Sequence, residues 1–429
     1  MTKKKVLLIW ILAIILISTP LYAISENAIA NQIIEAVTVN ANPKSDIEIA
    51  SEHALLVEPK TDTIIYERNA HTRAYPASLT KILCALVALE NAKLSDKTIV
   101  SENALKLIPK GYSIANFDVG EEVTMEILLE ALLLHSANEA ANIISEAISG
   151  SVEAFADKMN ARAVELGCEN THFVNGNGIH NEDHYTTAWD LYLISKECMK
   201  NEEFRRIVQL KEMVIPPSPQ HPADDRTFKN TNKLLIEGNK YYYEGTIGIK
   251  TGFTSEAQNC FIGAASRNNY ELINIVLAAP TINGESQRYP DVIKLFNYGF
   301  ENYKIDTLMD DGQIIKTIVI KNGTKETKRL NLRLEKGFSG FVKNDFDIAQ
   351  IEPQIKYTQE LVAPITAGTI MGTATYTIGT QEFTSNIIAT SDVITRTYYE
   401  IYILVGGFVL LIIGIIILSI HQKNNEQKE

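Results

Sequence analysis

The stretch PASLTKILCALVALE, residues 76–90, contains the feature that best indicates the fold and chemistry of this chain. Within it, Ser78 and Lys81 lie three residues apart at the head of an apolar run that is typical of a helix. Residues at this spacing share one helix face, with Cβ atoms roughly 5–6 Å apart. An amine at that distance can take a proton from a serine hydroxyl, which is otherwise a poor nucleophile. The Ser-x-x-Lys pattern occurs once in the chain and therefore predicts a nucleophile with its base.

Two further motifs follow Ser78 and give it a context. Ser136-Ala137-Asn138 comes first, and Lys250-Thr251-Gly252 follows much later in the chain. Ser-x-Asn alone carries little weight because it recurs elsewhere, whereas Lys-Thr-Gly occurs once. In this order the three motifs are typical of penicillin-binding proteins and class A β-lactamases. Ala137 replaces the usual Asp of the middle motif and leaves both functional side chains of that motif in place.

The sequence around these motifs resembles the D-alanyl-D-alanine carboxypeptidases, the low-molecular-mass penicillin-binding proteins of bacterial cell walls. The resemblance is close over residues 45–300 and looser over 304–392. Gln258 departs from the family pattern, which usually has Gly there, and we expect this change to affect a turn rather than the chemistry. The stretches that carry the resemblance are PASLTKILCALVALE (76–90), LLLHSANEAAN (132–142), LGCENTHFVN (166–175), HYTTAWDL (184–191) and GIKTGFTSEAQNCFIGAA (248–265).

The resemblance implies an α+β fold of the penicillin-binding protein and serine β-lactamase type. Such a domain has an antiparallel sheet flanked by helices and a helical subdomain, and we expect it to span residues 45–303. Beyond it, strand-length runs of alternating apolar and polar residues predict a small all-β domain at 304–392. Within that domain, Ile314–Ile320 and Thr327–Leu334 are expected to form a hairpin around a tight Asn322-Gly323 turn.

For the first two motifs, the resemblance implies a division of catalytic roles. Ser78 is the expected nucleophile and Lys81 the expected general base. Lys81 must be neutral to act, and burial with a second nearby cation achieves this by penalising its charged form. Ser136 is expected to relay the proton to the leaving amine, and Asn138 to hydrogen-bond a substrate amide.

The third motif and a downstream arginine are expected to hold the substrate. Lys250 is the expected second cation, which stays protonated and binds the substrate's terminal carboxylate together with the Thr251 hydroxyl. Gly252 is expected to let the substrate backbone approach the strand closely, since it has no Cβ. The oxyanion is expected between the backbone N–H groups of the nucleophile and Phe253. The resemblance also assigns carboxylate recognition to Arg288.

The implied activity is that of a serine-type D-alanyl-D-alanine carboxypeptidase. Ser78 would attack the carbonyl between the last two D-alanines of a peptidoglycan stem pentapeptide, and water would hydrolyse the acyl-enzyme. A β-lactam antibiotic would acylate the same serine. Neither a metal nor an organic cofactor is implied, and the sequence has no His-Glu-x-x-His zinc motif.

Three other functions stay open at this point. One is a D,D-endopeptidase that cuts peptidoglycan cross-links, and another is a catalytically silent penicillin-binding wall protein. The third is a β-lactamase, although the Glu-x-x-Leu-Asn pattern of class A enzymes is absent from the sequence. Nucleic acid is not expected as a partner, because phosphate binding depends on clustered Lys and Arg and this chain has a net charge of −12.

The N-terminal end of the chain predicts export. Lys3-Lys4-Lys5 precede an apolar run, and a small residue follows at Ala23. A basic start, a short apolar region and a small-residue site are the pattern of a secretory signal peptide, here residues 1–23.

The C-terminal end predicts a membrane anchor at residues 400–421. Ile401–Ile420 carries no charge and is long enough to cross about 30 Å of hydrocarbon. Lys423 and Lys428 follow, which places the tail inside by the positive-inside bias. We therefore expect a single-pass protein of the bacterial cell membrane with its catalytic domain on the extracytoplasmic side.

The 4 cysteines raise the question of disulfides in an exported protein. Cys84 and Cys260 fall in apolar patterns and are expected to be small buried residues. A Cys168–Cys198 disulfide stays open, because spacing alone does not decide it.

Overall fold

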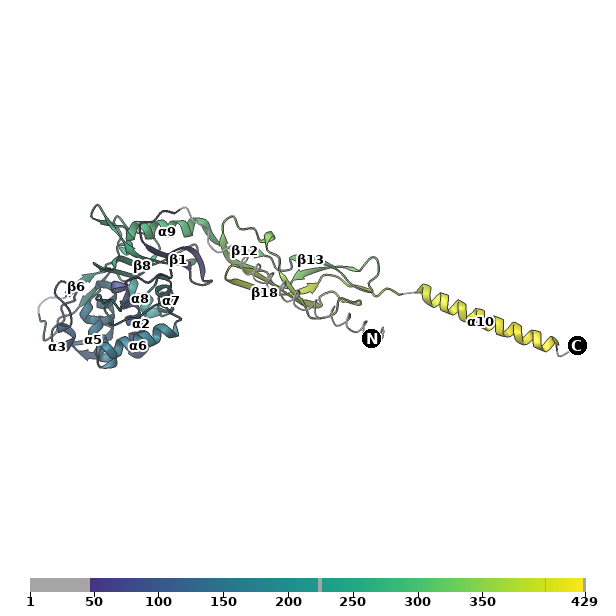
Figure 1. Cartoon of the computed structure of the whole chain (residues 1–429), viewed down its shortest axis with the longest axis horizontal. Helices are drawn as coiled ribbons and strands as arrows, with labels where there is room; N and C mark the ends of the chain where they lie inside the picture. Colours follow the sequence, from purple (N-terminus) through teal and green to yellow (C-terminus); the bar gives the residue numbers. More distant parts are fainter. Residues whose placement is uncertain (1–46, 223–225, 398, 427–429) are drawn as a thin grey trace, which may run out of the picture. The chain divides into compact units, whose positions relative to one another are not determined.

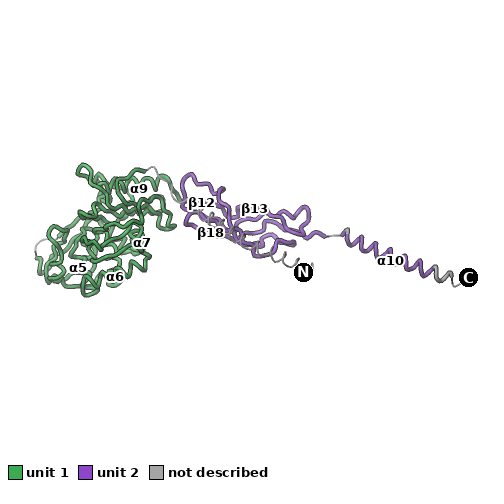
Figure 2. Tube along the Cα trace, viewed as in Figure 1, with its two compact units in different colours: residues 1–304 green, residues 305–429 purple. Residues whose placement is uncertain are grey.

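The structure of the protein is a computed structural model that describes residues 47–222, 226–397 and 399–426. The chain divides into two compact units, one ending at Lys304 and the other beginning at Ile305 (Figure 2). The predicted signal peptide, residues 1–23, lies outside the described residues.

A five-stranded antiparallel sheet is the framework of the first unit (Figure 1). β1 (His53–Glu58) and β2 (Thr63–Arg68) form the N-terminal hairpin, and three strands from much later in the chain complete the sheet, one of them paired with β1. These are β7 (Thr246–Thr254), β8 (Gln258–Arg267) and β9 (Tyr270–Ala279), and the strand order is β2-β1-β9-β8-β7. The Lys-Thr-Gly motif therefore lies on β7, at the edge of the sheet.

Alternation along the strands gives the sheet two packed faces. Successive side chains of a strand point to opposite faces, so Ile273 and Ile275 of β9 join the large core under the helical part of the unit. Leu272 points the other way, toward α9 (Arg288–Asn302), which covers the opposite face (Figure 1). Gly299 allows this close packing, because a Cβ there would lie 2.5 Å from a methyl carbon of Leu272.

The helices of the first unit lie mainly between β2 and β7 in the chain. α2 (Lys81–Asn91) is the central helix, and its residues Lys81 to Ala88 are all buried. The predicted α+β fold, with an antiparallel sheet, flanking helices and a helical subdomain, is confirmed. The other helices and short strands are α3 (Glu102–Lys106), α4 (Met125–Glu130), α5 (Asn138–Ser149), α6 (Val152–Glu165), α7 (Ala188–Cys198), α8 (Glu202–Gln209), β3 (Lys97–Ile99), β4 (Glu122–Thr124), β5 (Glu212–Ile215), β6 (Arg226–Lys229), β10 (Thr281–Ile282) and β11 (Glu285–Ser286).

The second unit contains an antiparallel sheet of five strands in the order β13-β14-β18-β17-β16. Leu330, Leu332 and Leu334 alternate along β14 and are fully buried, as a half-buried strand requires. The strands of this unit are β12 (Tyr303–Met309), which starts at the unit boundary and pairs with β15 (Phe338–Lys343), and β13 (Ile314–Val319), β14 (Arg329–Leu334), β16 (Gln354–Tyr357), β17 (Ile370–Ile378) and β18 (Gln381–Ala389).

The predicted hairpin of β13 and β14 is present, but its tight Asn322-Gly323 turn is wrong. Val319 pairs with Arg329, so a long connection separates the two strands. Lys321 and Gly323 form isolated bridges with Val362 and Thr395 instead of turning back directly. The sequence pattern identified the paired strands but not the distant segments that compete for the backbone between them.

The last helix, α10 (Tyr399–Glu426), contains an apolar segment, Ile401–His421, with a mean hydropathy of 3.1. Its length and composition are sufficient to cross a membrane. The cysteines are free and buried in the described part of the chain, so Cys168 and Cys198 do not form a disulfide.

Candidate active site

The turn that carries Ser78 joins the sheet to the central helix. A 3₁₀ turn, Ala77–Thr80, precedes α2, and Lys81 is the first residue of that helix. The Lys81 Nζ atom lies 2.9 Å from Ser78 Oγ. The three-residue spacing in the sequence therefore brings amine and hydroxyl into hydrogen-bond contact, as predicted.

Lys81 is fully buried, with a solvent exposure of 0%. Besides Ser78 Oγ, its amine contacts two further oxygens. Asn138 Oδ1 lies 2.9 Å away, and the Asn177 carbonyl oxygen accepts a hydrogen bond from the amine. Burial lowers the pKa of this amine to about 7, against the opposing effect of Cys84 and Glu139. A large fraction of the amine is therefore neutral at neutral pH.

The Ser-x-Asn motif lies at a break between two helices. A π-helical turn, Ala131–His135, ends at Ser136, which has left-handed backbone angles of φ 64° and ψ 30°. Helix α5 begins at Asn138, whose backbone N–H and side-chain amide both donate to the Ser113 carbonyl, at 3.0 and 2.9 Å. Asn138 is thus held on one side by Ser113 and contacts Lys81 on the other.

The Lys-Thr-Gly edge of β7 packs directly against the Ser78 turn. A Cβ on Gly252 would lie 3.1 Å from the Pro76 carbonyl oxygen and 3.3 Å from the Ser78 nitrogen. The glycine therefore allows β7 to approach the nucleophile's own backbone. The neighbouring Thr251 hydroxyl lies 2.8 Å from the Thr231 hydroxyl.

Lys250 is buried, with 1% exposure, and its amine donates to the Thr251 carbonyl at 3.0 Å. Burial lowers the pKa of this amine well below its usual value, and the charges of Lys81 and Arg288 lower it further. The sequence led us to expect an ammonium at Lys250. Burial in the protein disfavours that charge, and an anion bound beside the amine would favour it.

Arg288, at the start of α9, extends toward the same strand. Its guanidinium donates to the Gly252 carbonyl at 2.9 Å, while its Nε–H is buried and contacts no acceptor within the described residues. Phe253 follows on β7 with 61% exposure. The two side chains therefore differ in solvent exposure: the Arg288 guanidinium is partly buried, whereas the Phe253 ring is exposed.

A cavity of about 540 Å³ joins these elements. Seven of the nine sequence-predicted residues line it. Lys81 and Lys250 do not, but their buried amines contact the lining residues Ser78 and Thr251. The segment 110–113 and the turn 254–256 complete its walls. The full lining is Ser78, Lys110, Gly111, Tyr112, Ser113, His135, Ser136, Asn138, Gly178, Thr231, Thr251, Gly252, Phe253, Thr254, Ser255, Glu256 and Arg288.

Several residues that support the site were not singled out in the sequence. Gly178 has φ +81°, and a Cβ there would lie 2.0 Å from the Ala77 carbonyl oxygen. His184 accepts a hydrogen bond from the Val174 N–H at Nδ1, so its Nε2–H donates to the Thr80 hydroxyl at 2.7 Å. Burial lowers the pKa of His184 to about 3, which keeps the ring neutral. A buried His next to the Ser-x-x-Lys turn has no local sequence signal.

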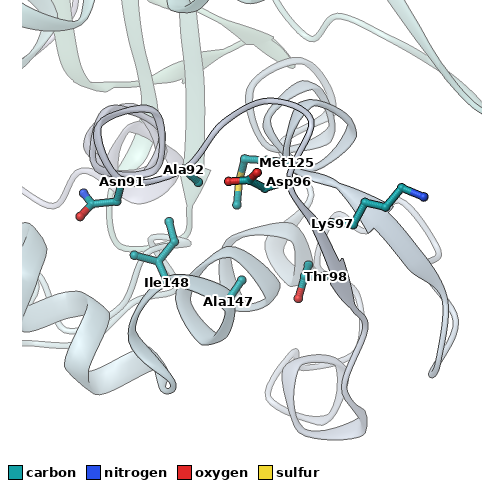
Figure 3. Close-up of a pocket in the computed structure, with 8 residues that line it drawn as sticks. All are labelled: Asn91, Ala92, Asp96, Lys97, Thr98, Met125, Ala147 and Ile148. Atoms are coloured by element: carbon teal, nitrogen blue, oxygen red, sulfur yellow. The ribbon is translucent and has the colours of Figure 1, made fainter.

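A second cavity, of about 260 Å³, lies beside the C-terminal end of α2 (Figure 3). Asp96 and Lys97 supply its charged groups, and none of the predicted catalytic residues lines it. Within the described residues, no group of three His, Cys, Asp or Glu side chains is placed to hold a metal ion. The lining residues are Asn91, Ala92, Asp96, Lys97, Thr98, Met125, Ala147 and Ile148.

Comparison with known proteins gives consistent results. The family model for peptidase S11, D-alanyl-D-alanine carboxypeptidase, matches residues 37–281. The D-alanyl-D-alanine carboxypeptidase DacF of Bacillus subtilis is 30% identical over 370 residues, which cover 85% of this chain and 89% of that protein. A D-alanyl-D-alanine carboxypeptidase of Streptomyces sp. K15 is 34% identical, over 62% of this chain and 94% of that protein.

Solved structures show the same fold. The carboxypeptidase DacD of Francisella tularensis matches with a TM-score of 0.62 at 24% identity, over 83% of this chain and 96% of that chain. A mutant of the Streptomyces K15 DD-transpeptidase matches with a TM-score of 0.55 at 34% identity, over 60% of this chain and all of that chain.

Proposed function

This chain belongs to the peptidase S11 family of D-alanyl-D-alanine carboxypeptidases, and we propose that Ser78 is its nucleophile and Lys81 its general base. It is accordingly a serine-type carboxypeptidase that acts on peptidoglycan and binds β-lactams. The finer proposal concerns which side chains perform the reaction and where the enzyme works.

One observation carries the assignment of the base. A neutral amine has two N–H donors and one lone pair. Lys81 Nζ contacts Asn138 Oδ1 and the Asn177 carbonyl oxygen, and both can only accept hydrogen bonds from it. The two N–H groups are thereby occupied, and the lone pair is left for the Ser78 hydroxyl at 2.9 Å. This is the arrangement in which the amine takes the hydroxyl proton as the oxygen attacks.

The reaction follows in two steps. Ser78 Oγ bonds to the carbonyl carbon between the last two D-alanines while its proton moves to Lys81. The bond to the terminal D-Ala nitrogen then breaks, and that amine takes the proton through the Ser136 hydroxyl. Water next attacks the acyl-enzyme, which releases the shortened stem peptide and restores Ser78. The backbone N–H groups of Ser78 and Phe253 hold the developing oxyanion, at about 3–4 kcal/mol per donor.

The substrate's terminal carboxylate completes the site electrostatically. The Arg288 guanidinium is cationic, and its charge disfavours the charged form of Lys250. A carboxylate bound beside Thr251 favours the charged form of Lys250. Substrates without a free terminal carboxylate leave Lys250 with its lowered pKa, so we expect the enzyme to prefer peptides that end in a free carboxylate. Asn138 is placed to bind a substrate amide at the same time.

We also propose that α10 anchors the enzyme in the cytoplasmic membrane, with the catalytic unit on the extracytoplasmic side. The segment Ile401–His421 is apolar all round, and none of its most apolar window is buried in the protein. Retention of the full chain in membranes after alkaline washing, and its release when the chain ends at Arg396, would support the anchor. Release of both would contradict it.

The assignment of Ser78 is tested with the full chain in detergent and a diacetyl-Lys-D-Ala-D-Ala peptide. Wild type should release D-Ala and react with labelled penicillin, whereas Ser78→Ala should do neither. Ser151→Ala, which changes the partly exposed N-cap of α6, is the matched control and should keep both activities. Release of D-Ala by Ser78→Ala would remove Ser78 from the mechanism. Labelling without D-Ala release by wild type would favour a silent penicillin-binding protein, and faster cleavage of cross-linked peptides an endopeptidase.

A further inference from the structure

Glu139 is a buried acid next to the catalytic cluster that the reaction above does not use. It is the second residue of α5, directly after Asn138, and has only 2% exposure. Its Oε1 atom accepts a hydrogen bond from the Ala115 N–H at 2.6 Å. Its Oε2 atom is buried and makes no hydrogen bond of good geometry within the described residues, although the N–H groups of Asn116 and of Glu139 itself also act on the carboxyl group. A buried carboxyl group with one unsatisfied oxygen is costly, so it calls for an explanation.

The contacts of Glu139 reach a wall of the active-site cavity. Residues 110–113 line that cavity, and the chain continues directly to Ala115. Ser113 is held by Asn138, and Ala115 is held by Glu139, so two successive residues of α5 fasten this wall segment. Asn138 in turn contacts the Lys81 amine. A change at Glu139 therefore reaches Lys81 through one intervening residue.

Other groups hold the same segment but carry different charges. His135 lies 3.1 Å from the Ile114 carbonyl oxygen, and burial lowers its pKa. Arg226 donates to the Asn116 carbonyl at 2.7 Å, and its charge is paired with Glu121. Among these clamps, Glu139 is the one whose charge acts on Lys81.

We propose that Glu139 is a positioning residue for acylation: its buried carboxyl group clamps the segment 113–116, which continues from the cavity wall at 110–113, to the start of α5, and its charge acts on the Lys81 amine. The inference rests on the proposed roles of Ser78 and Lys81. Glu139 touches neither the nucleophile nor the bond that breaks.

The charges around Lys81 decide what a change at Glu139 does. Within the described residues, four titratable groups interact electrostatically with the amine, namely Cys84, Glu139, His184 and Lys250. Burial raises the pKa of the Cys84 thiol to about 12 and lowers that of His184 to about 3, so both are neutral between pH 5 and 9. Lys250 disfavours a charge on Lys81, and a Glu139 carboxylate favours it. Burial raises the pKa of Glu139 itself to about 7, so the two groups titrate as a coupled pair.

Three variants of the full chain separate clamp from charge, with the rate constant for acylation by labelled penicillin measured from pH 5 to 9. Glu139→Gln keeps an acceptor for the Ala115 N–H and removes the charge. The rate constant is expected to fall on the acid side of its pH profile and to be constant at high pH, its plateau. For Glu139→Gln we expect this acid limb to move to lower pH by about 0.5–1 unit, with a plateau similar to that of wild type. Glu139→Asp keeps the charge but shortens the reach, so its limb should stay at the wild-type pH while its plateau falls about tenfold. Glu139→Ala should show both effects.

Glu153→Gln is the matched control, because Glu153 is the second residue of α6 and is exposed. Its profile should equal that of wild type. If Glu139→Gln has its acid limb at the same pH as wild type, the proposed effect of the Glu139 charge on Lys81 is wrong. If Glu139→Asp has the same plateau rate constant as wild type, the proposed clamp is wrong. Should Glu139→Gln fail to fold, the Glu139→Asp plateau still decides the clamp. Failure of the proposed function is distinct, because it would appear as absent labelling of wild type or as labelling of Ser78→Ala.

Discussion

The pH dependence of acylation should follow the charge of Lys81. The amine can accept the Ser78 proton only when it is neutral, and burial lowers its pKa from 10.5 to about 7. We therefore expect the acylation rate constant to rise with pH, to reach half its plateau near pH 7 and to fall tenfold for each unit below that. The midpoint is an apparent value that belongs to Lys81 together with Glu139.

The size of the effect follows from the same shift. At its usual pKa, about 0.03% of the amine would be neutral at pH 7, whereas a pKa of about 7 makes about half of it neutral. Burial thus raises the reactive fraction about 10³-fold. The charged form is penalised by about 5 kcal/mol, an order-of-magnitude figure for a fully buried amine.

The assay is stopped-time labelling with fluorescent penicillin between pH 5 and 9, with tryptophan fluorescence to show that the chain stays folded. Lys81→Met removes the amine and keeps an unbranched side chain, so labelling should fall by at least about 10³-fold at all pH values. Lys106→Met is the control, because Lys106 is exposed and forms a surface ion pair with Glu102. A rate constant that is flat from pH 5 to 8, or near-normal labelling of Lys81→Met, would refute the reasoning.

Two further substitutions test the backbone around the site. Gly178→Ala should abolish penicillin labelling and destabilise the fold by several kcal/mol, because its Cβ would lie 2.0 Å from the Ala77 carbonyl oxygen. Gly150→Ala is its control, because Gly150 has a similar φ but a Cβ there meets no atom of the described residues within 4 Å. This control should lose only about 1 kcal/mol of stability and keep labelling. Gln258→Gly should raise the midpoint of thermal unfolding by about 2–4 °C with unchanged labelling, because Gln258 has φ +57° and glycine adopts that conformation without strain; a lower midpoint would show that the Gln side chain stabilises the turn.

The parts of the site that depend on local geometry could be predicted from the sequence. Ser78 and Lys81 are one helical turn apart, so their contact follows from spacing alone. The Lys-Thr-Gly motif lies on a strand, and Gln258 adopts the left-handed conformation expected where the family has Gly. In each case the relevant neighbours are close in the sequence.

The parts that depend on distant neighbours could not be predicted. The Asn177 carbonyl binds Lys81 from 96 residues away, and a backbone oxygen has no sequence signal. Glu139 was within a motif stretch, yet its burial depends on Ala115 and the segment around it. The Asn322-Gly323 prediction failed for the same reason, because residues remote in the sequence form bridges with that backbone.

The geometry around Ser78 is unfavourable in isolation, and its neighbours explain why it persists. Ala77 and Ser136 have positive φ values of 48° and 64°, which are uncommon for residues with a side chain and cost about 1–3 kcal/mol each. Such a conformation holds only where the surroundings leave no alternative. The close approach of Gly178 to the Ala77 carbonyl oxygen and the hydrogen bond from His184 to the Thr80 hydroxyl restrict the Ala77 turn. Asn177, the neighbour of Gly178, contacts the buried Lys81 amine, so one segment packs against both the strained turn and the amine. A substitution that relaxes the turn should therefore raise the pKa of Lys81 and reduce acylation even when Ser78 and Lys81 are both intact.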